Sequence, residues 1–83
     1  MYYVYVLWSE KVKMRYVGST EAIDARLKQH NSGHARFTRR GIPWILLGTE
    51  EYPTKTEAIK REHFLKSGAG RALLDQLFPK YHR

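Results

Sequence analysis

Residues 2–8 read YYVYVLW, and this stretch decides the fold. Its β-branched and aromatic side chains make both alternating faces apolar, with Tyr3, Tyr5 and Leu7 on the same face. A strand that is apolar on both faces is typical of the middle of a sheet whose two sides are covered. We therefore expect residues 2–8 to form a central strand.

Two further strands are expected beside it. A polar connection, residues 9–14, leads to a short aromatic and β-branched run at residues 15–18, so these two segments predict an antiparallel hairpin that Gly18 ends. Residues 44–52 (WILLGTEEY) predict the third strand, which Pro53 breaks. A crossover through a helix can place this strand on the free edge of the first, which leaves the amino-terminal strand in the middle.

The first helix is expected from about residue 21 to residue 32. Ser19 or Thr20 is the expected cap at its start, and Gly33 is the expected exit. Ile23 and Leu27 form its inward stripe, and Arg26 and His30 lie beside that stripe, four residues apart. We expect the basic segment 34–43 that follows to be a loop.

Two more helices complete the expected architecture. A T-x-x-E capping box at residues 54–57 begins the second, which reaches about residue 67, and Gly68 and Gly70 mark its exit. Leucines at helical spacing predict a closing helix over residues 71–78. The expected fold class is α+β, with residues 1–83 as one domain. In it, a small three-stranded antiparallel or mixed sheet is flanked by helices in the order β-β-α-β-α-α.

The charge balance points to a polyanionic partner. Fifteen Lys and Arg stand against eight acids, a net charge of +7, and there is no acid between residues 25 and 49. Cations mixed with the aromatic rings of Phe37 and Trp44 are typical of nucleic-acid surfaces. An anionic membrane surface, an acidic protein and a merely solvated basic face are the alternatives. The residues expected to contact nucleic acid are Lys28, His34, Arg36, Phe37, Arg39 and Arg40.

Several classes of protein are excluded or disfavoured by composition. The chain has no cysteine, so disulfides, thiolate zinc sites and cysteine nucleophiles are excluded. No apolar run approaches the roughly 20 residues of a membrane span, and residues 1–8 lack the basic start and cleavage site of a signal peptide. We expect a cytoplasmic protein without a membrane partner, monomeric in the absence of other indications.

One acid, Glu62, is out of place. It falls in the apolar stripe of the second helix, which comprises Ala58, Ile59 and Leu65. Because an unpaired carboxylate is costly to desolvate, an inward one is normally paired, protonated or bound to a metal. The structural alternatives to a metal site are an ion pair of Glu62 with Arg26 and an ion pair of Glu62 with Lys66. The second pair, at i+4, is worth only about 0.3–0.5 kcal/mol on an exposed face.

Five positions on matching elements resemble those of the GIY-YIG nuclease family: Tyr5, Tyr16, Arg26, His30 and Glu62. The triplet at residues 3–5 (YVY) stands where the family's first triplet lies, and that at residues 16–18 (YVG) matches the second closely. The resemblance spans essentially the whole chain and is nearest to small free-standing bacterial members. It implies a metal-dependent endonuclease that hydrolyses phosphodiester bonds in DNA rather than RNA, structure-selective or weakly sequence-specific, with a place in DNA repair.

The resemblance also implies a role for each residue. Glu62 would bind one divalent cation, Mg²⁺ or Mn²⁺, which prefers oxygen ligands. Tyr5 would activate the attacking water with help from its neighbours, since a phenol of pKa near 10 is a poor base at neutral pH. Arg26 would bind the scissile phosphate. Tyr16 would orient water or phosphate, and His30 would assist proton transfer or hold Tyr5.

Some positions depart from the family pattern. Residues 3 and 4 replace the glycine and isoleucine of the first triplet, Val17 replaces the isoleucine of the second, and only Gln76 stands where many members carry an asparagine. A non-catalytic DNA- or RNA-binding module on the same scaffold is the alternative function, and a subunit recruited by a partner through the basic loop is a third. A zinc pair of His30 and His34 is disfavoured, since Gly33 ends the helix between them.

Overall fold

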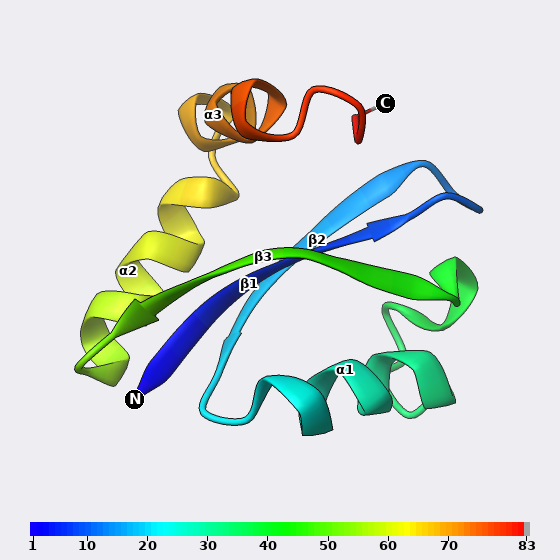
Figure 1. The fold of residues 1–83 in the computed structure, drawn as a ribbon, viewed down its shortest axis with the longest axis horizontal. Helices are drawn as coiled ribbons and strands as arrows, with labels where there is room; N and C mark the ends of the chain where they lie inside the picture. Colours follow the sequence, from blue (N-terminus) through cyan, green and yellow to red (C-terminus); the bar gives the residue numbers. More distant parts are fainter. Residues whose placement is uncertain (83) are drawn as a thin grey trace.

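One antiparallel sheet, with strand order β2-β1-β3, organises the chain (Figure 1). The computed structural model describes residues 1–82. The amino-terminal strand lies in the middle of the sheet, as the sequence predicts. The elements are β1 (Tyr2–Ser9), β2 (Met14–Thr20), α1 (Ile23–Ser32), the short 3₁₀ helix η1 (Arg39–Gly41), β3 (Trp44–Tyr52), α2 (Lys55–Leu65) and α3 (Gly68–Leu77).

The two faces of β1 contribute to two separate hydrophobic clusters. Val4 and Val6 pack with residues of α2 and α3, whereas Tyr5 and Leu7 pack with Trp44 and with residues of α1. Figure 1 shows α1 apart from α2 and α3, on the other side of the sheet. The alternation of side chains along one strand therefore produces a two-sided core, and it places Tyr5 on the α1 side. Among residues 1–82, no helix is long and apolar enough to span a membrane.

The start of α1 differs from the prediction. Neither Ser19 nor Thr20 caps the helix; Ala22 is the residue at the cap, and its side chain offers no hydrogen bond. Both predicted caps belong to β2 instead, where Ser19 pairs with Val4 of β1. The pairing of the strand extends past Gly18 and therefore keeps these hydroxyls out of the helix. Gly33 ends α1 in the left-handed conformation, as expected.

The junction between α2 and α3 also differs. The predicted capping box is confirmed at Thr54, whose side chain accepts the backbone N–H of Glu57, but α2 stops at Leu65. The closing helix already starts at Gly68, because the Ser67 hydroxyl caps it by accepting the N–H of Gly70. The two glycines that indicated a break are thus the first residues of a helix. The loop expected at residues 34–43 is confirmed apart from the turn η1.

Gly70 is needed for close packing between the two helices. A β-carbon at this position would lie 2.0 Å from the carbonyl oxygen of Phe64 and 2.4 Å from the Cα of Leu65. We expect Gly70→Ala to lower the free energy of unfolding by about 1–3 kcal/mol, the usual cost of overpacking. Urea denaturation measures it. Gly68→Ala is the matched control, since a β-carbon there meets nothing within 4 Å; equal losses in the two variants would contradict the packing explanation.

Candidate active site

Three buried side chains from three elements form a hydrogen-bonded chain. The Tyr5 hydroxyl on β1 lies 2.9 Å from Nε2 of His30 on α1, and Nδ1 of His30 lies 2.7 Å from Oγ1 of Thr38 in the basic loop. All three residues are buried. The structure therefore brings together two of the predicted catalytic residues, Tyr5 and His30, and adds Thr38, which the sequence did not single out.

The direction of these hydrogen bonds can be assigned. Oγ1 of Thr38 lies 3.2 Å from the carbonyl oxygen of Ala35, to which it donates its proton. The same oxygen must then accept from Nδ1–H of His30, which leaves Nε2 of the neutral ring without a proton. Nε2 consequently accepts the hydroxyl proton of Tyr5. Thr38 thus selects the tautomer in which His30 can act as a base toward Tyr5.

Trp44 positions Thr38 rather than stacking on nucleic acid. Its indole Nε1–H donates to the carbonyl oxygen of Thr38 at 2.6 Å, and its backbone exchanges two hydrogen bonds with the side chain of Asn31. The indole is buried against Tyr5 and Leu7. The expectation of an available ring at Trp44 was therefore wrong, because the start of β3 turns this side chain into the core.

Gly18 makes the space that Tyr5 occupies. The two residues pair directly across β1 and β2. A β-carbon at position 18 would lie 2.4 Å from the Tyr5 hydroxyl oxygen and 2.6 Å from Cζ of the ring. The absence of a side chain at Gly18 thus lets the phenol lie over its backbone and reach His30.

Tyr16 lies beside this pair at the edge strand of the sheet. Its ring centroid is 4.9 Å from that of His30 and 6.3 Å from that of Tyr5. On its other side, Nζ of Lys66 stands 5.8 Å from the centre of the ring. Tyr16 therefore connects the Tyr5–His30 pair to the side chains that α2 contributes.

Glu62 reaches the same edge from α2. One carboxylate oxygen accepts the Ser19 hydroxyl at 2.7 Å, and the other accepts Nζ of Lys66 at 2.7 Å. The Glu62 side chain is only 16% exposed, whereas that of Lys66 is 47% exposed. Among residues 1–82, Glu62 forms no ion pair with Arg26, so of the two pairs considered from the sequence the structure contains the one with Lys66.

Burial and neighbouring polar groups shift three pKa values at the site. Burial, reinforced by Tyr16 and Glu62, raises the pKa of Tyr5 to about 12, although the nearby Arg26 opposes the shift. Burial and then Arg26 lower the pKa of His30 from its ordinary value of 6.5. Burial alone would raise the pKa of Glu62, but the hydrogen bonds from Lys66 and Ser19 prevail and lower it. At neutral pH, Tyr5 is therefore a protonated phenol, His30 is neutral and Glu62 is ionised.

The donor set fits a hard divalent cation with a single protein ligand. Among residues 1–82, no three His, Asp or Glu side chains cluster as a metal cage. An ionised carboxylate with a neighbouring hydroxyl suits Mg²⁺, which keeps several waters and takes its remaining ligands from a phosphate. Lys66 would have to release one carboxylate oxygen of Glu62. Since the pair is exposed on its lysine side, this release costs little.

The side chains predicted to contact nucleic acid are exposed, and most of them belong to the basic loop. Thr38 anchors the centre of the basic loop against His30, while its neighbours Arg36, Phe37, Arg39 and Arg40 are exposed. Phe37 is 95% exposed and free to stack on a base. The Arg39 Nε–H donates to the carbonyl of Gly33. Lys28 and His34 are also exposed, the latter with Nδ1 2.9 Å from the Ser32 hydroxyl.

The sequence gives almost no indication that Thr38 takes part in the site. It is a small polar residue between aromatic and basic ones, and nothing in its spacing relates it to His30, which lies eight residues earlier. Its role depends on the path of the loop, which residues 34–43 alone do not specify. Gln76, the only candidate in place of the family's asparagine, is exposed on α3.

Comparison with known proteins identifies relatives of similar size. The profile of the GIY-YIG catalytic domain matches residues 1–72. A UPF0213 protein from Natronomonas pharaonis is 39% identical over 67 residues, which cover 80% of this chain and 78% of that protein. A UPF0213 protein from Streptococcus sanguinis is 38% identical over 73 residues, covering 87% and 83%. The solution NMR structure of a UPF0213 protein from Bacillus halodurans superposes with a TM-score of 0.57 at 34% identity, covering 96% of this chain and 88% of that one.

Proposed function

Because the chain belongs to the GIY-YIG family, a family of nucleases, we propose that it is an endonuclease that hydrolyses phosphodiester bonds in DNA with the help of one divalent cation. The main support is the hydrogen-bonded chain from Tyr5 through His30 to Thr38. A phenol that donates to a neutral imidazole is arranged to pass a proton on. In this proposal the enzyme acts in the cytoplasm.

The proposed reaction uses the hydrogen bond between Tyr5 and His30 as a proton relay. A water oxygen forms a bond to phosphorus while one of its protons moves to the Tyr5 oxygen, and the hydroxyl proton of Tyr5 moves to Nε2 of His30. The bond from phosphorus to the leaving oxygen breaks, and that oxygen takes the electron pair and then a proton from solvent. This relay avoids a free phenolate, which a pKa of about 12 makes rare at neutral pH.

Two other groups would stabilise the phosphate as its charge increases. Arg26 is partly exposed on α1, and its charge acts on both Tyr5 and His30, so a phosphate held by its guanidinium would be next to the relay. Glu62 would bind Mg²⁺ or Mn²⁺, which neutralises charge on the phosphate oxygens when bound. Tyr16 would orient water or phosphate.

The direct test is cleavage of defined DNA. Branched and linear labelled duplexes are incubated with the protein in Mg²⁺, in Mn²⁺ or in EDTA, and the products are resolved by denaturing electrophoresis. We expect cutting in either metal, a preference for branched DNA, and no cutting in EDTA. Arg26→Ala should cut more slowly than Lys28→Ala, an exposed cation on the same helix. Metal-independent cutting, or none under any condition, would contradict the proposal.

Affinity for DNA should come mainly from phosphate contacts of the basic loop. The exposed side chains of Arg36 and Arg40 would each release about one counterion, so the double variant Arg36→Ala/Arg40→Ala should reduce the slope of log affinity against log salt by about two. Fluorescence anisotropy at several salt concentrations measures the slope. A double variant of Lys55 and Lys60, exposed on α2, is the charge-matched control; an equal reduction there would indicate non-specific attraction.

The tautomer of His30 should depend on the Thr38 hydroxyl. Thr38→Val keeps the shape but removes the acceptor for Nδ1–H, so we expect about tenfold slower cleavage at pH 7. Thr38→Ser should retain the wild-type rate. Because the pKa of His30 is lowered, its neutral form persists at pH 7, and the wild-type rate should fall only below pH 6.5.

Nitrogen chemical shifts of the His30 ring report the tautomer directly. A ring protonated at Nδ1 in the wild type and at Nε2, or mixed, in Thr38→Val would support the positioning role. Identical ring shifts in both proteins, with identical rates, would contradict it.

One observation favours a second candidate, a non-catalytic nucleic-acid-binding module. Both carboxylate oxygens of Glu62 already accept hydrogen bonds, from Ser19 and from Lys66. Titration with Mn²⁺ in the presence of DNA distinguishes the two functions, because a bound paramagnetic ion broadens the resonances of Glu62. Binding of DNA with no such broadening at millimolar Mn²⁺, and no cutting, would favour the module.

A further inference from the structure

A pocket of about 370 Å³ opens between the β1–β2 hairpin and the start of α3. Its walls include four cations, Lys13, Arg15, Lys66 and Arg71, and none of its lining residues is acidic. The rest of its lining is mostly apolar or aromatic, with Trp8 and Tyr16 among it. Cations beside apolar walls suit a ligand that combines a phosphate with a flat apolar group.

Three of the four cations form ion pairs with acids outside the pocket lining, which leaves Arg71 as the one without an ion pair among residues 1–82. Arg15 is just 13% exposed and donates through Nη2 to Asp75 at 2.7 Å, while its Nη1 is enclosed without a hydrogen-bond partner among residues 1–82. A buried guanidinium nitrogen without an acceptor is unfavourable. Arg71 is exposed at the start of α3, where its backbone carbonyl accepts a long bond from Arg15. An anionic ligand would therefore improve the electrostatics of the pocket.

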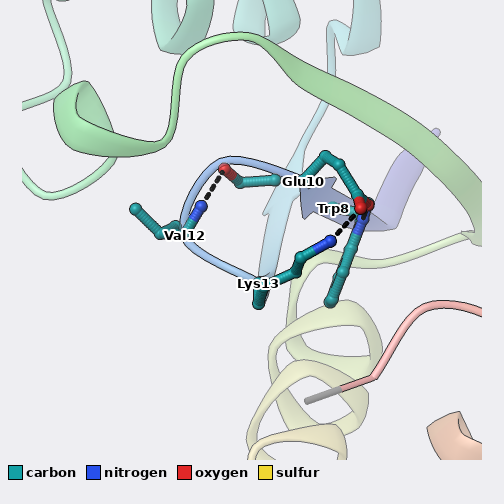
Figure 2. A network of polar contacts seen from close by, with 5 residues as sticks. Trp8, Glu10, Val12 and Lys13 are labelled. Carbon is teal, nitrogen blue, oxygen red and sulfur yellow. Dashed lines mark hydrogen bonds and ion pairs between the residues drawn. The ribbon is translucent and has the colours of Figure 1, made fainter.

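The turn between β1 and β2 carries a network of polar contacts (Figure 2), and two of its members, Trp8 and Lys13, also line the pocket. The indole Nε1–H of Trp8 donates to Glu10 at 2.7 Å, and Nζ of Lys13 binds the other oxygen of the same carboxylate. The N–H of Val12 donates to the Ser9 hydroxyl. These bonds tie the side chains of Trp8 and Lys13 to the same carboxylate at the edge of the pocket.

The pocket and the candidate active site share two residues. Tyr16 lines the pocket and also contacts His30, and Lys66 lines it while binding Glu62. A polynucleotide whose phosphate lies at Tyr5, Arg26 and Glu62 would thus have a neighbouring nucleotide at the mouth of this pocket.

The geometry points to a subsite for one unpaired nucleotide of the strand that is cut. Its phosphate would contact Arg71 and Arg15, and its base would lie between Tyr16 and the half-exposed Met14. A base in an intact duplex is stacked and paired, so it cannot enter without being extruded. This inference rests on the proposed function, which it deepens: the substrate class becomes DNA with an unpaired nucleotide beside the cut, as in a flap, gap or bulge.

Binding is tested apart from cleavage. ¹⁵N-labelled protein is titrated with a 5′-phosphorylated thymidine trinucleotide in EDTA, and amide and indole resonances are followed. We expect the indole N–H of Trp8 and the amides of Arg15 and Arg71 to shift. Arg71→Ala should weaken this binding about tenfold, the effect of losing one charge-assisted contact. Lys60→Ala, which removes an exposed cation on α2 away from the pocket, should leave it unchanged.

A second, conservative variant separates a loss of binding from a loss of the fold. Arg15→Lys preserves a cation for Asp75 but lacks the second amino group, and it should also weaken binding. Shifts confined to the basic loop and to His30, no shifts at all, or Trp8 shifts that Arg71→Ala leaves intact would each overturn the subsite. Trinucleotide binding in the pocket by a protein that cuts no DNA would instead overturn the proposed function, so the two failures are distinguishable.

Discussion

Glu62→Gln is expected to lower the rate of metal-dependent cleavage by about 10²–10³-fold, because it removes the charge that, in the proposed mechanism, would hold the cation against the phosphate. Glutamine keeps the length of the side chain and an oxygen that can accept the Ser19 hydroxyl, so the fold should persist. Single-turnover cleavage at saturating protein measures the effect on the chemical step.

The control for Glu62 is Glu57→Gln, which removes an exposed acid from the same helix. It should cleave at the wild-type rate. If Glu62→Gln retains undiminished activity, the cation is held elsewhere and the proposed metal ligand is wrong. Raising the concentration of Mn²⁺ should not restore Glu62→Gln to more than a small part of the wild-type rate.

Tyr5→Phe is expected to slow cleavage by about 10²–10⁴-fold, the range for removal of a positioned proton-transfer group. The phenyl ring still fits over Gly18, but the proposed relay from water to His30 would lose its middle member. Nε2 of His30 then lacks its donor, which costs about 1 kcal/mol of stability. Single-turnover rates and urea unfolding, measured on one preparation, separate the two effects.

Tyr3→Phe is the matched control for Tyr5, since Tyr3 lies on the same face of β1 two residues earlier. It should cleave like the wild type. A Tyr5→Phe enzyme with an unchanged rate would mean that water is activated without the phenol, and the relay would then be wrong at its first step.

The sheet could be predicted because its signals are local. The β-branched and aromatic run at residues 2–8, apolar on both faces, and the turn residues after it predict β1, the hairpin and the central position of the first strand. The bounds of β3 match the prediction at both ends, since residues before and after it change composition sharply.

The helix ends could not be predicted because they depend on tertiary contacts. Gly70 has a low intrinsic helix propensity, which indicates a break, yet its missing side chain is what allows α3 to approach α2. Ser19 is a good helix cap by residue type, but its strand pairing and its bond to Glu62 take precedence. In both positions a long-range contact outweighs the local preference.

The candidate site was partly accessible from sequence. Periodicity placed Tyr5 and His30 on their elements, the family resemblance related the two, and the structure places them in contact. Thr38 and Trp44 could not, because the loop between α1 and β3 has no periodicity, and the same aromatic residue can stack on a ligand or fill a core. The roles of all five predicted catalytic residues remain predictions until the variants are measured.

The close approach of Tyr5 to the backbone of residue 18 couples two positions that are thirteen residues apart. Any larger residue at 18 displaces the phenol, so only a smaller residue at 5 can compensate, and that exchange removes the hydroxyl. The glycine is thus constrained by the chemistry of another residue and not by its own backbone. Evolutionary drift at position 18 should consequently occur only in lineages that have already given up the phenol, and these lineages would lack the proposed relay.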